Sequence, residues 1–317
     1  MTAGDTIFAL SSGAGRAAVA VIRISGAATA PLLEAMAGGL PPARQLVLRS
    51  IMDASEVLDR GMVAWFPGPR SFTGEDCAEL HLHGSPAVLS AVMQRLSAWP
   101  GVRPAEAGEF TRRAFLNGKM DLVEVEGLGD LLAARTAAQR RQALRQLSGQ
   151  ASSVFDAWRD QLLLIRADIE AAVDFADEAG VAEAALPGID RGIRDLLGSI
   201  KQSVAAAAAS EIIRDGLRVV LAGQPNTGKS SLLNALARRE AAIVSDLPGT
   251  TRDAIEVSLD VEGIPVVLTD TAGLRPDTPD ALEAEGIRRS RQHISGADVV
   301  VWVWSPDIPG SEVPDSA

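Results

Sequence analysis

The sequence predicts a multidomain α/β protein with three successive domains: an α+β domain over residues 1–118, a helical domain over 119–214 and a P-loop domain with a mostly parallel sheet over 215–317. The length of 317 residues exceeds that of one typical domain. Short alternating apolar segments give way to helical spacing near Asp121, and a phosphate-binding motif begins at Gly223. These three observations set the order of the domains.

In the first domain, strand-like and helix-like segments are interspersed, which is typical of an α+β fold. We expect strands over residues 5–10, 19–24, 47–52, 62–66 and 77–83, and helices over 30–37 and 86–98. Gly13, Gly15 and Ala18 imitate a dinucleotide-binding fingerprint, but a strand pattern follows them where that motif requires a helix. We therefore reject a dinucleotide site there.

The strand expected over 77–83 carries polar residues at every second position. Cys77, Glu79, His81 and His83 therefore share one of its faces. Two neighbouring imidazoles could hold a metal ion, but this domain contains no further histidine, so we favour a polar face that lines a cleft. The charged stretch 103–119 is expected to be a solvated face, and the alternative is the rim of a pocket for an anionic ligand.

The middle of the chain shows helical periodicity. Gly149 and the pair Pro187-Gly188 are expected to divide it into about three helices, and the run Ala205 to Ala209 favours a helix that leads into the nucleotide domain. Apolar residues three and four apart form stripes that we expect to be the core of a bundle. These stripes consist of Val125, Leu128 and Leu132, of Trp158, Leu162, Ile165, Ile169 and Val173, and of Ile193, Leu196, Ile200 and Val204.

The stretch from Leu217 to Leu236 contains an apolar strand, a glycine-containing loop and a helical pattern. The loop, Gly223-Gln-Pro-Asn-Thr-Gly-Lys-Ser230, matches the motif that wraps backbone N–H groups around a polyphosphate at a helix N-terminus. Lys229 would reach the β- and γ-phosphates, and the hydroxyl of Ser230 would bind Mg²⁺. Because the motif stands between a strand and a helix, as its function requires, we reject the alternative of a glycine-rich turn without a ligand.

Two further segments extend this motif to the pattern of a switch GTPase. Thr251, in a loop rich in Gly and Thr, offers Mg²⁺ a second hydroxyl. Asp270 is expected to hold Mg²⁺ from the end of its strand, and Gly273 to offer its N–H to the γ-phosphate. We therefore predict a Ras-like G domain rather than a generic ATPase. Strands are expected over 255–261, 264–269 and 299–304, the last of them buried.

GTPases of this class read guanine with an Asn-Lys-x-Asp motif, and no asparagine among the 317 residues precedes a lysine. Loss of that charge-assisted contact weakens binding of the base. We therefore expect this chain to bind GTP weakly and to discriminate poorly against ATP. The G domain is expected to be incomplete, with an open edge on its parallel sheet and a Pro-rich, acidic, unstructured tail over 305–317.

Composition restricts the partners and the compartment. A net charge of −11 argues against a broad nucleic-acid-binding surface, so any RNA contact has to be local or made through a partner. The single cysteine, Cys77, excludes internal disulfides and suits a reducing compartment. The sequence shows no signal peptide and no apolar run of bilayer length. We expect a soluble, cytoplasmic protein that does not bind membranes.

Several stretches of the N-terminal domain are distinctive: Asp5-Thr-Ile, Val21-Ile-Arg-Ile-Ser-Gly26, Ser71-Phe-Thr-Gly-Glu-Asp76 with Glu79-Leu and His83-Gly, and Gly108-Glu-Phe-Thr-Arg-Arg-Ala-Phe-Leu-Asn-Gly-Lys119. Together with the P-loop and Asp270-Thr-Ala-Gly273, they resemble the bacterial tRNA-modification GTPase family called MnmE or TrmE, over nearly the whole chain. The P-loop and Asp270-Thr-Ala-Gly273 are shared by many GTPases, whereas the N-terminal stretches are specific to the family.

The resemblance implies a folate-binding N-terminal domain that forms a homodimer, a helical domain and an inserted G domain. Such proteins act with an FAD-containing partner of the MnmG type to add a carbon-5 substituent to the wobble uridine of certain tRNAs, with the tRNA held largely by the partner. The second half of the helical domain and the family's Cys-containing C-terminal motif do not occur by residue 317. We therefore expect this chain to be a family member that is truncated within the G domain.

The resemblance also implies a set of ligands. Arg23, Glu79 and Lys119 match the residues that bind 5-formyltetrahydrofolate. Mg²⁺ is implied at Ser230 and Thr251. The implied K⁺ ligands are Asn226, Ser245, Leu247 and Thr250. The implied GTP-binding residues are Asn226, Thr227, Gly228, Lys229, Ser230, Ser231, Ser245, Asp246, Leu247, Pro248, Gly249, Thr250, Thr251, Asp270, Thr271, Ala272 and Gly273.

Hydrolysis needs a substitute for the water-orienting glutamine of many switch GTPases, because Leu274 occupies that position. The resemblance implies that K⁺ at Asn226 takes the place of an arginine finger. It also implies two catalytic residues, which are Lys229 and a glutamate in the second switch. Glu283 matches that glutamate when Gly286-Ile287, which follows it, is aligned with the same pair in the family. Glu285 is the alternative, because the preceding loop is one residue longer than in relatives. Both glutamates could instead only solubilise the exposed face of a helix.

Two other functions stay open at this point. A ribosome-assembly switch GTPase would carry an RNA-binding module or a basic stripe, and we find neither in the sequence. A truncated product would bind folate through its N-terminal domain while its G domain is inert.

Overall fold

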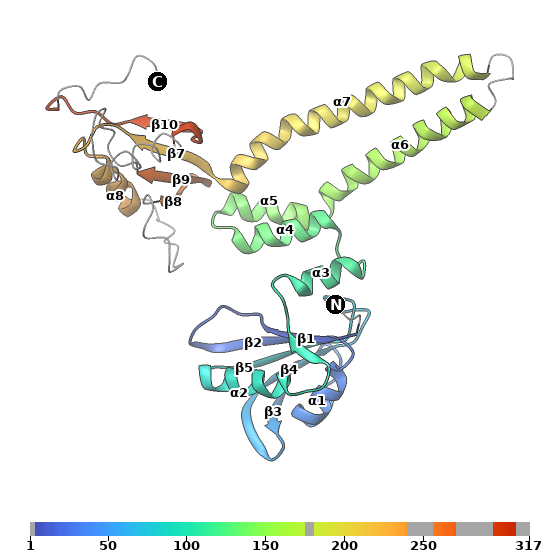
Figure 1. Ribbon diagram of the computed structural model, residues 1–317, viewed down its shortest axis with the longest axis vertical. Helices are drawn as coiled ribbons and strands as arrows, with labels where there is room; N and C mark the ends of the chain where they lie inside the picture. The colour runs from blue at the N-terminus through green and yellow to red at the C-terminus, as the bar shows by residue number, and fades with distance from the viewer. Residues whose placement is uncertain (1–3, 175–180, 240–255, 271–293, 309–317) are drawn as a thin grey trace, which may run out of the picture. The chain divides into compact units, whose positions relative to one another are not determined.

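The computed structural model describes residues 4–174, 181–239, 256–270 and 294–308. The chain divides into two compact units, Met1–Val125 and Glu126–Ala317. Each unit has a sheet with its own buried apolar cluster (Figure 1).

The first unit is built on a six-stranded sheet in the order β3-β4-β5-β2-β1-β6. All neighbouring strands are antiparallel except β1 and β6, which are parallel. The strands are β1 (Thr6–Leu10), β2 (Ala17–Ser25), β3 (Val47–Asp53), β4 (Glu56–Phe66), β5 (Cys77–Gly84) and β6 (Val102–Pro104).

Three helices belong to this unit: α1 (Thr29–Ala37), α2 (Pro86–Ser97) and α3 (Glu109–Leu116). Leu32 of α1 and Leu96 of α2 pack with Phe8 and Leu80 of the sheet in one core. The five strands and two helices expected from the sequence are confirmed. Strand β4, however, begins six residues earlier than expected. Its first half is polar, so the apolar pattern did not reveal it, and it is held in the sheet by pairing with β3. The sequence pattern does not predict the short β6 or the charged helix α3.

Four helices follow: α4 (Leu122–Ala133), α5 (Ala137–Leu147), α6 (Gln150–Asp174) and α7 (Val181–Asp215). The expectation of a break at Pro187 is wrong, because Pro187 lies inside α7. A proline removes one backbone hydrogen bond, and this one stands near the start of a long helix, where the many bonds that follow offset the loss. Gly149, in contrast, separates α5 from α6 as expected.

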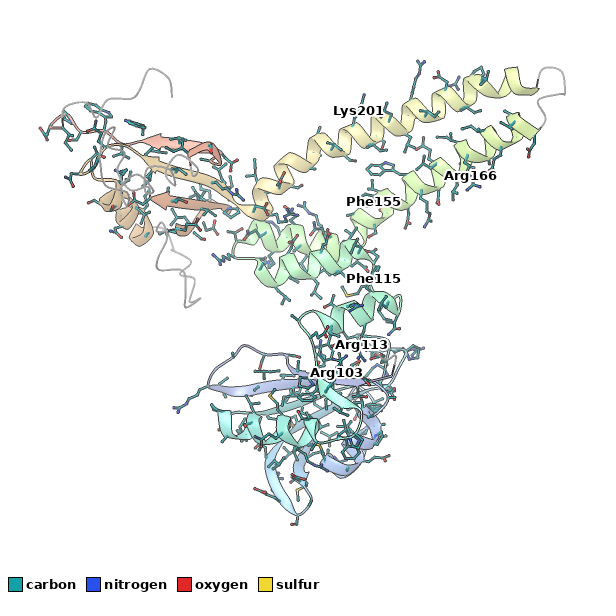
Figure 2. All side chains as sticks on the ribbon, in the orientation of Figure 1. Arg103, Arg113, Phe115, Phe155, Arg166 and Lys201 are labelled. Carbon is teal, nitrogen blue, oxygen red and sulfur yellow. The ribbon has the colours of Figure 1, made fainter. Side chains whose placement is uncertain are left out.

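Helices α6 and α7 lie side by side (Figure 1) and bury Ile165, Ile189 and Leu196 between them. The expectation that the whole apolar stripe is core is wrong, because Leu162 and Val173 are 53% and 68% exposed. Each stripe is wider than the strip that one partner helix covers. Phe155 of α6, labelled in Figure 2, is 55% exposed, and its ring packs edge-on against Trp158 with the ring centroids 5.3 Å apart. Within the described ranges, none of the helices has the length and apolar character needed to cross a membrane.

The second unit carries a four-stranded sheet in the order β10-β7-β9-β8. Its elements are β7 (Leu217–Ala222), α8 (Lys229–Arg239), β8 (Glu256–Val261), β9 (Ile264–Asp270) and β10 (Val299–Trp302). The pairs β10·β7 and β7·β9 are parallel and β8·β9 is antiparallel, which confirms the mostly parallel sheet of a P-loop domain. The expectation that residues 299–304 are buried is wrong: β10 is an edge strand among the described residues, so Val299 and Val300 are each 42% exposed.

Candidate functional sites

The phosphate-binding loop joins the carboxyl end of β7 to the first turn of α8. Gly223 has a φ of +143°, and a Cβ at this position would lie 2.2 Å from the carbonyl oxygen of Val303. The N–H of Val303 donates to the carbonyl oxygen of Ala222 at 2.7 Å, so the segment after β10 fixes the base of the loop. Only glycine fits where the chain turns from strand to loop.

Lys229 is buried at the start of α8. Its Nζ donates to the carbonyl oxygens of Gly223 and Gln224, at 3.0 and 2.8 Å. Burial lowers the pKa of Lys229, while the nearby Asp270 carboxylate opposes that shift. The ammonium group is therefore already held inside the loop that would surround a polyphosphate.

The hydroxyl of Ser230 donates to Oδ2 of Asp270 at 2.6 Å. The other carboxylate oxygen, Oδ1, is buried and has no hydrogen-bond partner among the described residues. A hydroxyl and a carboxylate with an unsatisfied oxygen are hard oxygen donors of the kind that Mg²⁺ prefers. These residues therefore fit the Mg²⁺ site expected from the sequence.

In the first unit, Arg23 of β2 stands opposite Glu79 of β5 in the strand register. The Arg23 Nη2 donates to Glu79 Oε1 at 2.7 Å, and the other carboxylate oxygen lies 3.2 Å from His81 Nε2. The Arg23 guanidinium also lies 4.9 Å from the ring centroid of Phe72. A cation and a carboxylate are thus held together beside an aromatic ring.

Lys119 reaches the loop that carries Phe72. Gly74, two residues further along, has a φ of +82°, and a Cβ there would lie 3.2 Å from Lys119 Cγ. The side-chain amide of Asn117 donates to the carbonyl oxygen of Thr73 at 2.7 Å and fixes this approach. The structure therefore brings Arg23 and Glu79 into contact and places Lys119 against the same loop.

Known proteins match both halves of the chain. The family described as "GTP-binding protein TrmE N-terminus" matches residues 6–119, and the family described as "50S ribosome-binding GTPase" matches residues 218–315. The "tRNA modification GTPase MnmE" of Methylobacterium sp. (strain 4-46) is 57% identical over 99% of this chain and 72% of its own length. The chain belongs to the MnmE family.

Other MnmE relatives span two kinds of organism. The protein of Chelativorans sp. (strain BNC1) is 55% identical over 98% of this chain and 70% of its own length. The mitochondrial "5-taurinomethyluridine-[tRNA] synthase subunit GTPB3" of Danio rerio is 52% identical over 93% of this chain and 59% of its own length. The chain therefore spans between about three fifths and three quarters of these relatives.

The metal interpretation of the polar face of β5 is wrong for this MnmE-family chain. The Cys77 thiol is buried and contacts the hydroxyls of Thr73 and Ser25, at 3.1 and 3.4 Å. His83 instead pairs with Asp59, at 2.8 Å from Nδ1 to Oδ1. Within the part of the chain that the structure describes, no cluster of three or more His, Cys, Asp or Glu residues could hold a metal ion.

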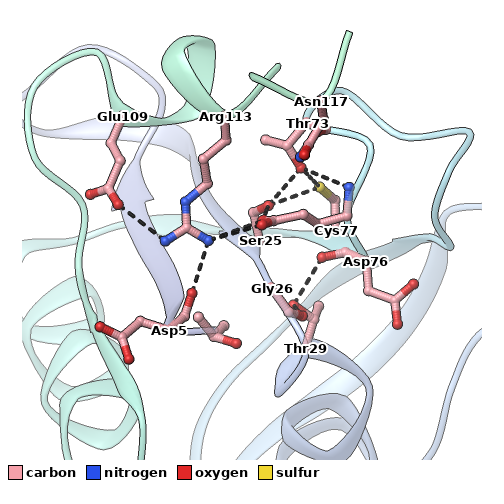
Figure 3. Close-up of polar contacts among 12 residues, drawn as sticks. Asp5, Ser25, Gly26, Thr29, Thr73, Asp76, Cys77, Glu109, Arg113 and Asn117 are labelled. Carbon is pink, nitrogen blue, oxygen red and sulfur yellow. Dashed lines mark hydrogen bonds and ion pairs between the residues drawn. The ribbon is translucent and has the colours of Figure 1, made fainter. Parts of the chain in front are cut away.

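The charged stretch 103–119 is not a simple solvated face, because Glu109 is buried. Its carboxylate accepts from Arg103 at 2.7 and 2.8 Å and from Arg113 at 3.1 Å. Arg113 also donates to the backbone oxygen of Asp5 (Figure 3). It donates to the Glu75 carboxylate as well, at 3.0 Å. This network ties α3 to the loop on which the candidate folate residues converge.

Sequence reasoning overlooked this network and Phe72. The four-residue spacing of Glu109 and Arg113 is a helical ion-pair signal that could have predicted α3. The contacts to Asp5 and Glu75 have no local signal, because they join residues far apart in the chain.

A large part of the predicted MnmE site lies outside the described residues. This applies to Ser245, Asp246, Leu247, Pro248, Gly249, Thr250, Thr251, Thr271, Ala272, Gly273, Leu274, Glu283 and Glu285. Asn226 and Ser231 are described and exposed, and Asn226 has a φ of +66°. Thr227 is buried, and its hydroxyl donates to the carbonyl oxygen of Gln224 at 2.9 Å.

Proposed function

We propose that this chain binds and hydrolyses GTP at the P-loop and thereby takes part in adding a carbon-5 substituent to the wobble uridine of tRNA. The observation that carries this proposal is the meeting of Ser230 and Asp270 beside Lys229, at the carboxyl ends of two parallel strands. That geometry suits a nucleoside triphosphate. Membership of the MnmE family supports tRNA as the substrate of the whole system.

Lys229 acts as a fixed positive charge. When phosphates enter, its Nζ exchanges the carbonyl oxygens of Gly223 and Gln224 for phosphate oxygens, without having to leave the loop. The N–H groups at the start of α8 stabilise the same negative charge. Ser230, Asp270 and Thr251 would hold Mg²⁺, which when bound neutralises charge on the transferring phosphoryl group.

The remaining catalytic groups are proposed from the family pattern. Asn226 would supply a carbonyl oxygen to K⁺ together with Ser245, Leu247 and Thr250, and Glu283 would orient the attacking water. Since a water-orienting contact strengthens in the transition state, Glu283→Ala should lower kcat with little effect on GTP affinity.

The first unit is proposed to bind 5-formyltetrahydrofolate. Arg23 would pair with a carboxylate of the ligand, Glu79 would accept N–H groups of the pterin, and Lys119 would add a second cation. The Arg23–Glu79 ion pair supports this assignment, because it holds in one place a cation for a ligand carboxylate and a carboxylate for ligand N–H groups.

The partners are proposed in the same way. A homodimer through the first unit, an FAD-containing partner of the MnmG type and a cytoplasmic location fit a protein of this family. The acidic net charge fits a division of labour in which the partner holds most of the tRNA.

The test uses Ser230→Ala and, as a control, the exposed Ser97→Ala in α2. Phosphate release from GTP is measured on the purified proteins, and tRNA nucleosides are analysed in cells that carry each variant as their only copy. We expect Ser230→Ala to abolish both phosphate release and the carbon-5-substituted uridine, and Ser97→Ala to retain both. Normal nucleosides with defective ribosomal subunits would instead support the ribosome-assembly alternative, and no phosphate release from the unaltered chain would support the inert G domain.

A further inference from the structure

Helix α5 carries a concentration of positive charge that is unusual for this chain. Asp and Glu exceed Lys and Arg by 41 to 30 in the whole sequence. Between Asp130 and Asp156, however, the sequence contains four arginines and no acidic residue. Three of these arginines, Arg140, Arg141 and Arg145, lie on α5, and we call them the α5 arginines.

The α5 arginines are exposed. The opposite side of the helix packs inward: Ala143 is fully buried, and the Gln142 side chain donates to the carbonyl oxygen of Ser210 in α7 at 3.0 Å. Gln139 likewise donates to the carbonyl oxygen of Arg214 at 2.9 Å. One side of α5 therefore holds the helix in place, and the α5 arginines are left on the other.

Arginines on the neighbouring helices behave differently. Arg159, Arg166 and Arg194 each pair with an acidic residue on their own helix, at 3.1, 2.8 and 3.0 Å (Figure 2 shows Arg166). The α5 arginines have no ion pair within the described residues. These three arginines of α6 and α7 are therefore paired within their own helices, whereas the α5 arginines are not.

Arg145 lies in the last turn of α5, where a positive charge is favourable, but Arg140 and Arg141 lie nearer the start of the helix and gain nothing from that effect. Arg141 and Arg145 are one turn apart, and like charges at this spacing destabilise a helix by about 0.2–0.5 kcal/mol. An exposed helix needs only polar residues for solubility, and glutamate at either position would form a favourable pair. The cost is better explained by a negatively charged partner that the α5 arginines bind.

We propose that the α5 arginines bind the phosphate backbone of tRNA. This inference rests on the proposed function, which makes tRNA the substrate. Guanidinium groups match phosphate oxygens bidentately, and the proposed function supplies tRNA as the polyanion, so we choose RNA rather than an acidic protein. The contact is local, as the net charge requires.

The test compares two triple variants of the whole chain with the same change in charge. One is Arg140→Gln with Arg141→Gln and Arg145→Gln, and the control is Arg159→Gln with Arg166→Gln and Arg194→Gln. Fluorescence anisotropy measures binding of a labelled tRNA transcript over a series of KCl concentrations. Because each phosphate contact contributes about one to the slope of log K against log salt, we expect the α5 variant to lower that slope by two to three and to weaken binding by at least about tenfold. The control should change affinity by less than about twofold.

Several outcomes would overturn the inference: an unchanged slope in the α5 variant, equal losses in both variants, no binding of tRNA by the unaltered chain, or competition by polyglutamate as strong as by unlabelled tRNA. Phosphate release from GTP, measured on the same preparations, should be equal in all three proteins. If the α5 arginines fail this test while GTP hydrolysis and the modified uridine persist, the proposed function stands and only the docking surface is wrong.

Discussion

At the scale of single residues, Glu109 is a buried carboxylate whose pKa is strongly shifted by its neighbours. Hydrogen bonds from Arg103, then from the backbone N–H of Glu106 and from Arg113, hold its pKa at about 2, below the ordinary 4.5, although burial acts in the opposite direction. The same contact raises the pKa of Arg103. The ionised carboxylate therefore stabilises the fold above about pH 4.5, and this contribution is lost as the pH falls toward 2.

We expect Glu109→Gln to lower the free energy of unfolding at pH 7 by roughly 1–3 kcal/mol, because it leaves Arg103 and Arg113 without their shared charge partner. Urea unfolding followed by circular dichroism measures the difference from the unaltered protein at several pH values. The difference should shrink as the pH falls from 4.5 to 2, since the glutamate is then protonated as well. A difference that does not depend on pH would show that packing, not charge, causes the loss.

Residues that act through neighbours in the chain could be predicted from the sequence, and residues that act across it could not. The loop around Lys229 was predictable because its partners, Gly223 and Gln224, belong to the same motif. The buried state of Glu109 was not, because its neighbour Arg113 is fixed by Asp5, more than a hundred residues away in the sequence.

At the scale of elements, the helices show the same contrast between local patterns, which the sequence predicts, and long-range packing, which it does not. Periodicity predicts α6 and α7, but it cannot state how much of an apolar stripe a partner covers. The local rule for proline predicts a break that the length of α7 overrides. The glycines of α7 then offer a measure of how closely the two helices pack.

We expect opposite results from two glycine-to-alanine changes in α7. Gly198 is exposed with open space around it, so Gly198→Ala should raise the free energy of unfolding by roughly 0.5–1 kcal/mol through helix propensity. Gly192 faces Ile165, and a Cβ there would lie 3.1 Å from Ile165 Cγ1. The crowding should cancel that gain or reverse it. Thermal unfolding followed by circular dichroism compares them, and equal increases in Tm would contradict the packing of Gly192 on Ile165.

At the scale of the whole molecule, the two candidate sites belong to different compact units, each with its own core. Lys229 and Ser230 depend on the sheet of the second unit, and Arg23 and Glu79 depend on the sheet of the first. The fold class was predictable at this scale because each domain has a distinct pattern of apolar residues. Nothing in either pattern links the chemistry of one site to that of the other.

We therefore expect the two binding activities to be lost separately. Lys229→Ala should weaken nucleotide binding by at least about tenfold, since it removes the buried charge from the phosphate loop, and should leave 5-formyltetrahydrofolate binding unchanged. Arg23→Ala should weaken folate binding and leave nucleotide binding unchanged. Calorimetric titration of both ligands into both variants measures the four affinities, with Arg112→Ala as an exposed control in the first unit. If either variant weakens both ligands by the same factor at unchanged Tm, the sites are energetically coupled and the separation by units is wrong.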